Sequence, residues 1–244
     1  MTGYLSLEIR RGVRNGRFLG LVVAWPVAAY LLFSAVFAKQ PASQGLSPKV
    51  EIMVAMAAFG AMGSVLMATG PGLAAERRSG WLRQLALTPL DRGKMLACRV
   101  VAALVLTLPA IVLTFVAAAV VQGVQLPLWE WPAMVVVMGL GCLPFAAIGV
   151  VVGCLAGGEG AAGVTMALYL VLAVLGGLWV PAKILPGPLR ALCAALPSNG
   201  VARLGWRLAA GAAPQVEAVL LLAGWLVATA AVAALASRRV VLAR

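Results

Sequence analysis

The polar chemistry of this chain is concentrated in residues 75–94, a basic segment between two long apolar stretches. In this segment Glu76 is followed directly by Arg77 and Arg78, and further basic residues are interleaved with leucines. Carboxylate and guanidinium groups at this density can form charge-assisted hydrogen bonds with another protein surface. Because charged groups are costly inside a bilayer, we interpret the segment as a docking surface in the cytoplasm.

The rest of the sequence contains no catalytic or metal-binding motif. Histidine is absent, the single aspartate is Asp91, and the four cysteines form no CxxC pair. Zinc-protease motifs and histidine-based catalytic triads therefore lack the residues that they need. No GxxxxGK[ST] sequence occurs, so the chain is not expected to bind ATP itself. We predict no enzyme activity, no metal site and no cofactor in this chain.

The composition indicates a membrane protein. Of the 244 residues, 63% are hydrophobic and 11% are charged, whereas soluble domains are about half apolar and about a quarter charged. The net charge of +12 is better explained by basic residues that flank membrane spans than by nucleic-acid binding. We therefore predict a lipid bilayer as the environment and no nucleic-acid partner.

Six apolar runs are long enough to cross a bilayer, which requires about 20 residues per helix. We predict an all-α membrane protein with a single transmembrane domain over residues 1–244. It comprises an interfacial helix at 1–17, a cytoplasmic loop at 74–98, an outer re-entrant segment at 181–215, and spans at about 18–37, 51–73, 99–121, 132–155, 161–180 and 216–236.

Basic residues are distributed unevenly between the two ends of these spans. Most of them belong to the N-terminal tail, the second connection and the C-terminal tail, which six spans place on one side. The positive-inside rule makes that side the cytoplasm, so both termini are predicted to be cytoplasmic. These residues are Arg10, Arg11, Arg14, Arg17, Arg77, Arg78, Arg83, Arg92, Lys94, Arg99, Arg238, Arg239 and Arg244.

The N-terminal tail is predicted to be an amphipathic helix that lies on the membrane. Leu5, Ile9 and Val13 recur at four-residue spacing, and arginines occupy the opposite face. A helix with one apolar and one basic face binds in the interfacial plane of a bilayer. We expect this helix to lead directly into the first span.

The outer segment 181–215 is predicted to be a helical hairpin before the last span. Prolines at its start break the preceding helix, and short helical patterns follow at 189–196 and 201–209. Ser198 or Asn199 is a candidate N-cap for the second helix. Two apolar helices of half the span length suggest a hairpin that re-enters the outer leaflet.

Hydroxyl groups are the main polar groups at mid-membrane depth. No ionisable residue is predicted there, which argues against a carrier driven by protons or sodium ions. The hydroxyls are expected either to bond within their own helices or to line a path for an apolar or amphiphilic cargo. The candidates for this path are Thr69, Thr107, Thr114 and Tyr169.

The basic segment itself is predicted to form a helix, a break and a second helix. Trp81, Leu82 and Leu85 form one apolar edge, and the first helix ends at Thr88 because the residue before Pro89 avoids the α conformation. Two interpretations stay open on these residues alone. The segment is either a lever that fits a groove in a soluble partner or a solvated connector whose arginines set the topology.

The segment resembles the signature loop of ABC-2 type transporter permeases, the membrane subunits of bacterial ABC exporters. The matching residues read Glu76-Arg77-x-x-Gly80-x-Leu82-x-x-Leu85-x-x-Thr88-Pro89-Leu90. The resemblance extends over nearly the full chain, since the N-terminal helix, the six spans and an outer Leu-Pro segment follow in the same order. Where the family often has a second acid two residues after the first, this chain has Arg78.

The resemblance implies a half-transporter in the bacterial cytoplasmic membrane. Two copies, or this chain and a paralogous permease, would form a homodimer or heterodimer. Two separately encoded P-loop ATPase subunits, which bind ATP and Mg²⁺, would dock beneath it. The coupling contact would comprise Glu76, Arg77, Gly80, Trp81, Leu82, Leu85, Thr88 and Pro89, with a smaller second contact at Glu159.

The implied function is export of a hydrophobic or amphiphilic small molecule, such as a drug, an antibiotic or a lipid-like compound, by ATP-driven alternating access. Export of a polysaccharide or glycolipid is an alternative within the same family. A secondary carrier or an immunity membrane protein without an ATPase is an alternative outside it. We expect Glu76→Ala and Gly80→Pro to leave the protein in the membrane while uncoupling transport from ATP hydrolysis.

Overall fold

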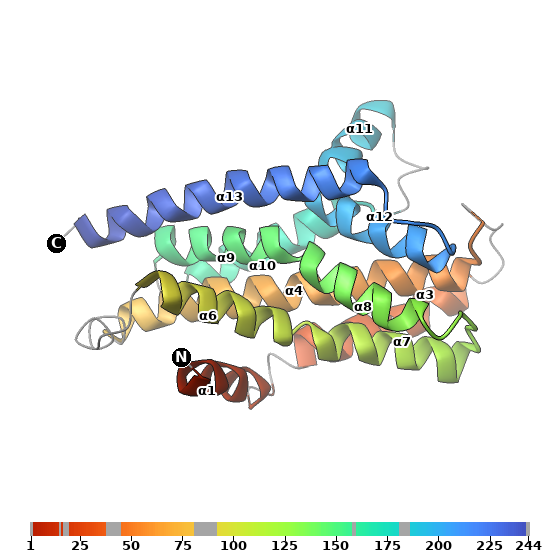
Figure 1. The fold of residues 1–244 in the computed structure, drawn as a ribbon, viewed down its shortest axis with the longest axis horizontal. Helices are drawn as coiled ribbons and strands as arrows, with labels where there is room; N and C mark the ends of the chain where they lie inside the picture. The colour runs from red at the N-terminus through yellow and green to blue at the C-terminus, as the bar shows by residue number, and fades with distance from the viewer. Residues whose placement is uncertain are drawn as a thin grey trace.

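The computed structural model describes residues 2–14, 16, 20–37, 45–80, 92–157, 160–180 and 186–242. The regular elements in these ranges are all helices, which confirms the all-α part of the predicted fold class. Figure 1 shows them as an elongated bundle. The elements are α1 (Thr2–Val13), the π-helix η1 (Gly20–Ala24), α3 (Trp25–Val36), α4 (Pro48–Arg78), α6 (Arg92–Val105), α7 (Leu108–Gln122), α8 (Glu130–Gly141), α9 (Leu143–Leu155), α10 (Gly160–Leu175), α11 (Gly187–Ala195), α12 (Pro197–Ala209) and α13 (Val216–Leu242).

Prolines mark where many of these helices begin. They occupy the first turn of α3, α4, α7, α9, α11 and α12. A proline fits this position because the first turn has no intrahelical partner for its missing N–H. Pro109 and Pro144 therefore divide two of the predicted spans, 99–121 and 132–155, into the pairs α6–α7 and α8–α9.

Helix α4 is the central element of the bundle. Its 31 residues extend for about 46 Å at 1.5 Å per residue, and most of its side chains are buried. It packs against α3, α7, α9, α10 and α12, and Figure 1 shows it running lengthwise between them. The core is therefore arranged around one helix that connects both ends of the molecule.

Four helical stretches in the described ranges are long and apolar enough to cross a membrane: Pro48–Arg78, Gly93–Gln122, Glu130–Leu155 and Val216–Ser237. They correspond to the predicted second, third, fourth and sixth spans. The predicted first and fifth spans correspond to shorter apolar helices, Val22–Val36 and Gly160–Leu175. The count of six spans and their orientation therefore remain predictions.

The N-terminal helix α1 packs against α6. A methyl group added at Gly12 would lie 2.5 Å from a terminal carbon of Leu106, the residue after α6, so α1 packs closely against the end of that helix. Figure 1 places α1 and the C-terminal end of α13 at the same end of the bundle. The location of α1 in a membrane interface stays a prediction.

The outer segment contains the two short helices that the sequence predicts, α11 and α12. Helix α12 is buried between α4, α8 and α13, whereas α11 projects from the bundle in Figure 1. The predicted N-cap is wrong, because Leu196 occupies that position and no side chain caps the helix. Ser198 and Asn199 instead donate hydrogen bonds to Leu172 O at 2.7 Å and Gly176 O at 3.1 Å. Both bonds attach α12 to the end of α10.

Candidate functional site

A buried ionic network lies where α1, α4 and α6 meet. Arg99 Nη2 of α6 donates to Glu76 Oε1 of α4 at 2.5 Å, and both side chains are at least 95% buried. The same guanidinium nitrogen lies 3.5 Å from Glu8 Oε1 of α1. One arginine therefore links the N-terminal helix, the central helix and the helix that follows the basic segment.

Arg77 makes the next connection, from α4 to the end of α9. Its Nη1 donates to Gly153 O at 2.9 Å and also to Cys154 O. These two carbonyls belong to the last turn of α9, where backbone acceptors lack intrahelical partners and the helix dipole is negative. The guanidinium group of α4 thus provides hydrogen-bond donors for carbonyl groups at the end of α9.

The chain turns away from helix α4 at Gly80. Its φ of +72° is a left-handed conformation, and its N–H donates to Arg77 O at 3.4 Å. A glycine adopts this conformation at a helix C-terminus without steric cost. Helix α4 therefore continues through Arg78 into the predicted cytoplasmic loop, and the chain turns at Ser79 and Gly80.

The rest of the predicted coupling contact falls on residues 81–91, and the second contact on 158–159. These stretches lie outside the described residues. They contain Trp81, Leu82, Leu85, Thr88, Pro89 and Glu159. Their roles stay predictions, while the structure places Glu76 and Arg77 inside the bundle beside the start of this segment.

The four candidates for a translocation path are buried. The hydroxyls of Thr69, Thr107 and Thr114 donate to Val65 O, Leu104 O and Ala110 O at 2.6–2.7 Å, each within its own helical stretch. Bonding within the helix was the first of the two interpretations of these residues.

Tyr169 is the fourth candidate, and its ring stacks on Phe59 at 4.4 Å. Its buried hydroxyl has no hydrogen-bond partner among the residues that the structure describes. Cβ atoms added at Gly63 would lie 2.7 Å from the ring, so the tyrosine packs tightly against α4. A role of these four side chains in transport stays a proposal.

Two members of the buried network, Arg99 and Glu8, were not predicted as functional residues. Sequence reasoning used Arg99 only as one of the basic residues that set the orientation. The signal for pairing is weak, since 23 positions separate Arg99 from Glu76 and 91 separate it from Glu8. Only the packing of three helices brings these side chains together.

Comparison with known proteins identifies the family of this chain. The family model for the ABC-2 family transporter protein matches residues 21–238. This chain belongs to the ABC-2 transporter family. YvfS of Bacillus subtilis (strain 168), whose name describes a transport permease, is similar, with 29% identity over 219 residues that cover 90% of this chain and 89% of YvfS.

Membership of the ABC-2 family shows what kind of protein contains the buried network. An ABC-2 permease is the membrane component of an ABC transporter and associates with an ATPase subunit, so this chain is a transport subunit without a catalytic role. The several apolar helices are those of a multi-pass membrane protein. In this permease the ionic network lies beside the connection between two of the long apolar helices.

Proposed function

We propose that this permease exports a hydrophobic or amphiphilic small molecule across the bacterial cytoplasmic membrane by ATP-driven alternating access. Two permease subunits, identical or paralogous, pair above two P-loop ATPase subunits. The segment beyond Gly80 docks into the ATPase, and its movement on ATP binding switches the permease between inward-open and outward-open states.

The observation that carries this proposal is the set of contacts at the end of α4. Arg99 ties α4 to α6 and α1, and Arg77 ties α4 to α9. A force applied to the segment that begins after Gly80 therefore acts on four helices at once. A ligand-driven switch needs contacts that differ between two states, and packed helices move as rigid bodies that can supply them.

This proposal divides the coupling residues into two groups. Glu76, Arg77 and Gly80 are positioning residues, because they hold the end of α4 and the direction in which the chain leaves it. The docking residues are those further along the segment: Trp81, Leu82, Leu85, Thr88 and Pro89. Glu159 supplies the smaller second contact between α9 and α10.

The bonding of the polar side chains within the helices favours an apolar cargo. The buried threonine hydroxyls are engaged by backbone carbonyls, which leaves few groups to bind a charged or highly hydroxylated molecule. Arg203 in α12 bonds to Gln215 Oε1, and Lys49 at the start of α4 bonds to Gln122 O. We therefore favour a drug, antibiotic or lipid-like compound over a polysaccharide.

The test is co-reconstitution of the permease with its ATPase in sealed vesicles. ATP-dependent movement of a hydrophobic fluorescent dye is expected, and it should stop when the P-loop lysine of the ATPase is replaced. Trp81→Ala and Leu85→Ala should leave the permease folded and ATP hydrolysis intact while dye movement falls at least tenfold. Arg190→Ala, at the opposite end of the bundle, is the control that should keep dye movement.

Two results would contradict the proposal. Dye movement at the full rate without the ATPase would indicate a secondary carrier. An assembled complex whose ATPase responds to no compound in a broad panel of apolar and glycan substrates would indicate an immunity protein.

A further inference from the structure

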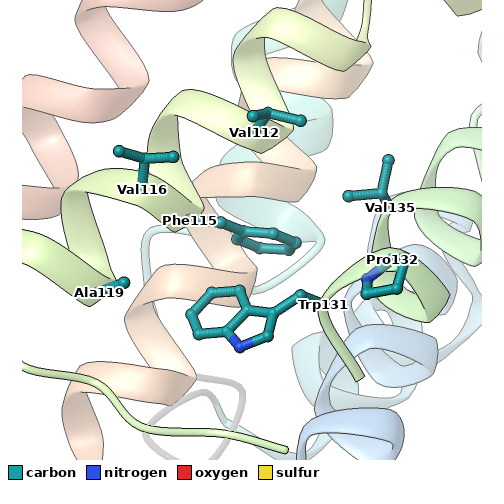
Figure 2. A pocket seen from close by; sticks show the side chains of 7 residues that line it. All are labelled: Val112, Phe115, Val116, Ala119, Trp131, Pro132 and Val135. Atoms are coloured by element: carbon teal, nitrogen blue, oxygen red, sulfur yellow. The ribbon is translucent and has the colours of Figure 1, made fainter. Parts of the chain in front are cut away.

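A shallow apolar groove lies on the surface between α7 and α8, near the loop that joins them (Figure 2). Its volume is about 270 Å³. The rings of Phe115 and Trp131 pack edge to face within it, with centroids 5.5 Å apart and ring planes at 69°. The complete lining is Val112, Phe115, Val116, Ala119, Trp131, Pro132 and Val135.

The shape of the groove suits one extended hydrocarbon chain. Val112, Val116 and Ala119 follow each other at three- and four-residue spacing, so the lining runs about 10 Å along one face of α7. Val112 and Val116 are 41% and 49% exposed, and the groove is therefore open at the side. It lies below the range of about 300–1,000 Å³ that holds drug-sized molecules, and it is too small for a helix about 10 Å across.

The ammonium group of Lys49 lies near the end of this groove. Lys49 Nζ, at the start of α4, donates to Gln122 O of α7 at 3.1 Å. Gln122 follows Ala119 by one helical turn, about 4.5 Å along the axis. An ammonium group has three donors, and within the described ranges no carboxylate forms an ion pair with Lys49. It can therefore bind an additional anion.

The aromatic side chains at this end fit a membrane interface. Trp129, in the turn before α8, is 58% exposed, and Trp131 lines the groove two positions later. Tryptophan rings are enriched at the level of lipid headgroups. The hydrocarbon lining thus adjoins tryptophan rings and an ammonium group, as the acyl chain of a phospholipid adjoins its glycerol region and phosphate.

We propose that the groove binds one acyl chain of an anionic phospholipid whose phosphate is held by the Lys49 ammonium group. The proposal rests on the membrane orientation in the proposed function, which places this end of the bundle in the outer leaflet. It needs neither the cargo nor the ATPase.

The test uses the full permease in phosphatidylcholine nanodiscs that contain phosphatidylglycerol with a photoreactive acyl chain. After irradiation, the labelled peptides are mapped by mass spectrometry. Labelling of residues 112–119 and 131–135 is expected to exceed that of other lipid-facing helix surfaces at least fivefold. Ala119→Trp should reduce this labelling to background by filling the groove. Val120→Trp, at the next position and 77% exposed outside the lining, should not change it.

The role of the cation is tested with a second pair of variants. Lys49→Gln should lower labelling by phosphatidylglycerol at least threefold relative to phosphatidylcholine with the same photoreactive chain, while Lys49→Arg should preserve the preference. Size-exclusion profiles show which variants are folded. Even labelling of all lipid-facing surfaces, or unchanged labelling in folded Ala119→Trp, would overturn the proposal.

A disulfide between two Val116→Cys copies would also overturn it, because the groove would then be a contact between permeases. Failure of the proposed function would give a different combination of export and labelling results. If ATP-driven export is absent, the labelling should still be confined to the groove. If the labelling is diffuse while export persists, only the lipid site is refuted.

Discussion

At the residue scale, Arg99 is the side chain on which the end of α4 depends. It pairs with Glu76 at 2.5 Å and lies 3.5 Å from Glu8, so one buried cation stands between two acids. Burying such charges is expensive, and the attraction between them offsets the cost only while the partners stay together. The network is therefore better understood as a device that fixes three helices in one arrangement than as a large net source of stability.

A graded series of substitutions tests this interpretation. Glu76→Ala should lower the free energy of unfolding by about 3–5 kcal/mol, because it leaves a buried guanidinium group without its nearest partner. Glu76→Gln should lower it less, since an amide oxygen still accepts from Arg99. Glu8→Gln should have the smallest effect because its contact with Arg99 is longer. Detergent-induced unfolding followed by tryptophan fluorescence measures all three.

Equal losses for Glu8→Gln and Glu76→Ala would contradict the series. The structure also changes the expectation for Glu76→Ala as a coupling variant, since loss of stability would accompany any loss of coupling. Gly80→Pro carries a similar complication, because proline cannot adopt the φ of +72° at this position and removes the N–H that bonds Arg77 O. Substitutions of Trp81 and Leu85 separate the two effects better.

At the element scale, the close crossing of α4 and α9 holds the long helices together. A Cβ atom added at Gly149 would lie 1.9 Å from Thr69 Oγ1, and one added at Gly153 would lie 2.8 Å from Gly70 O. Small residues allow such an approach, and in a membrane the resulting van der Waals contacts drive helix association. Gly149 and Gly153 recur at four-residue spacing, which is typical of a helix packing face, and the structure identifies α4 of the same chain as its partner.

Gly149→Ala is expected to destabilise this crossing by about 1–3 kcal/mol through overpacking. Gly163→Ala on α10 is the matched control, because an added Cβ meets no atom within 4 Å there. Its stability should be unchanged or slightly higher, since alanine favours helix more than glycine. Thermal aggregation monitored by size-exclusion chromatography compares the two. Equal melting of both variants would refute tight packing at Gly149.

The attachment of α12 gives a second prediction at this scale. Asn199→Ala removes the bond to Gly176 O and should cost about 1 kcal/mol or more, because that carbonyl is buried. Hydrogen exchange should accelerate in α12, residues 197–209. Ser237→Ala is the control, since its hydroxyl bonds only to Ala234 O in its own exposed turn. Unchanged exchange in Asn199→Ala would show that the bond to Gly176 O is not needed to hold α12.

At the scale of the whole molecule, the two ends of the bundle differ in chemistry. The end of α4, the start of α6 and helix α1 share the ionic network at one end. The start of α4, the α7–α8 loop and the turn before α13 lie at the opposite end of the bundle in Figure 1. The proposed function requires the first end to face the cytoplasm, where an ATPase would dock, and the second to face the outer side.

Cysteine labelling tests this orientation. Ser79→Cys should react with a membrane-impermeant maleimide only in inverted vesicles, whereas Gln125→Cys and Ala213→Cys should react only in intact cells. All four native cysteines are buried, so the background should be low. Labelling of Ser79→Cys and Ala213→Cys from the same side would exclude the proposed topology.

Local patterns were sufficient to predict several parts of this permease. Apolar runs predicted the helices, and the acid–arginine–glycine pattern resembled the family to which the chain belongs. Glycines at four-residue spacing, such as Gly149 and Gly153, are typical of closely packed helices. Each of these features depends on residues that are neighbours along the chain or on one helix face, so the sequence alone determines them. The breaks at Pro109 and Pro144 were not predicted, and α4 ends at Arg78 rather than continuing to Thr88.

Other features required the tertiary structure. The pairing of Arg99 with Glu76 and Glu8, the bonds of Arg77 to α9, and the use of Ser198 and Asn199 as anchors rather than caps all join residues far apart in the sequence. The residues next to a charged or polar side chain in the sequence do not indicate which distant group it will contact. The packing of helices decides which groups come within bonding distance, and so it decides whether a residue forms a surface contact or a buried link.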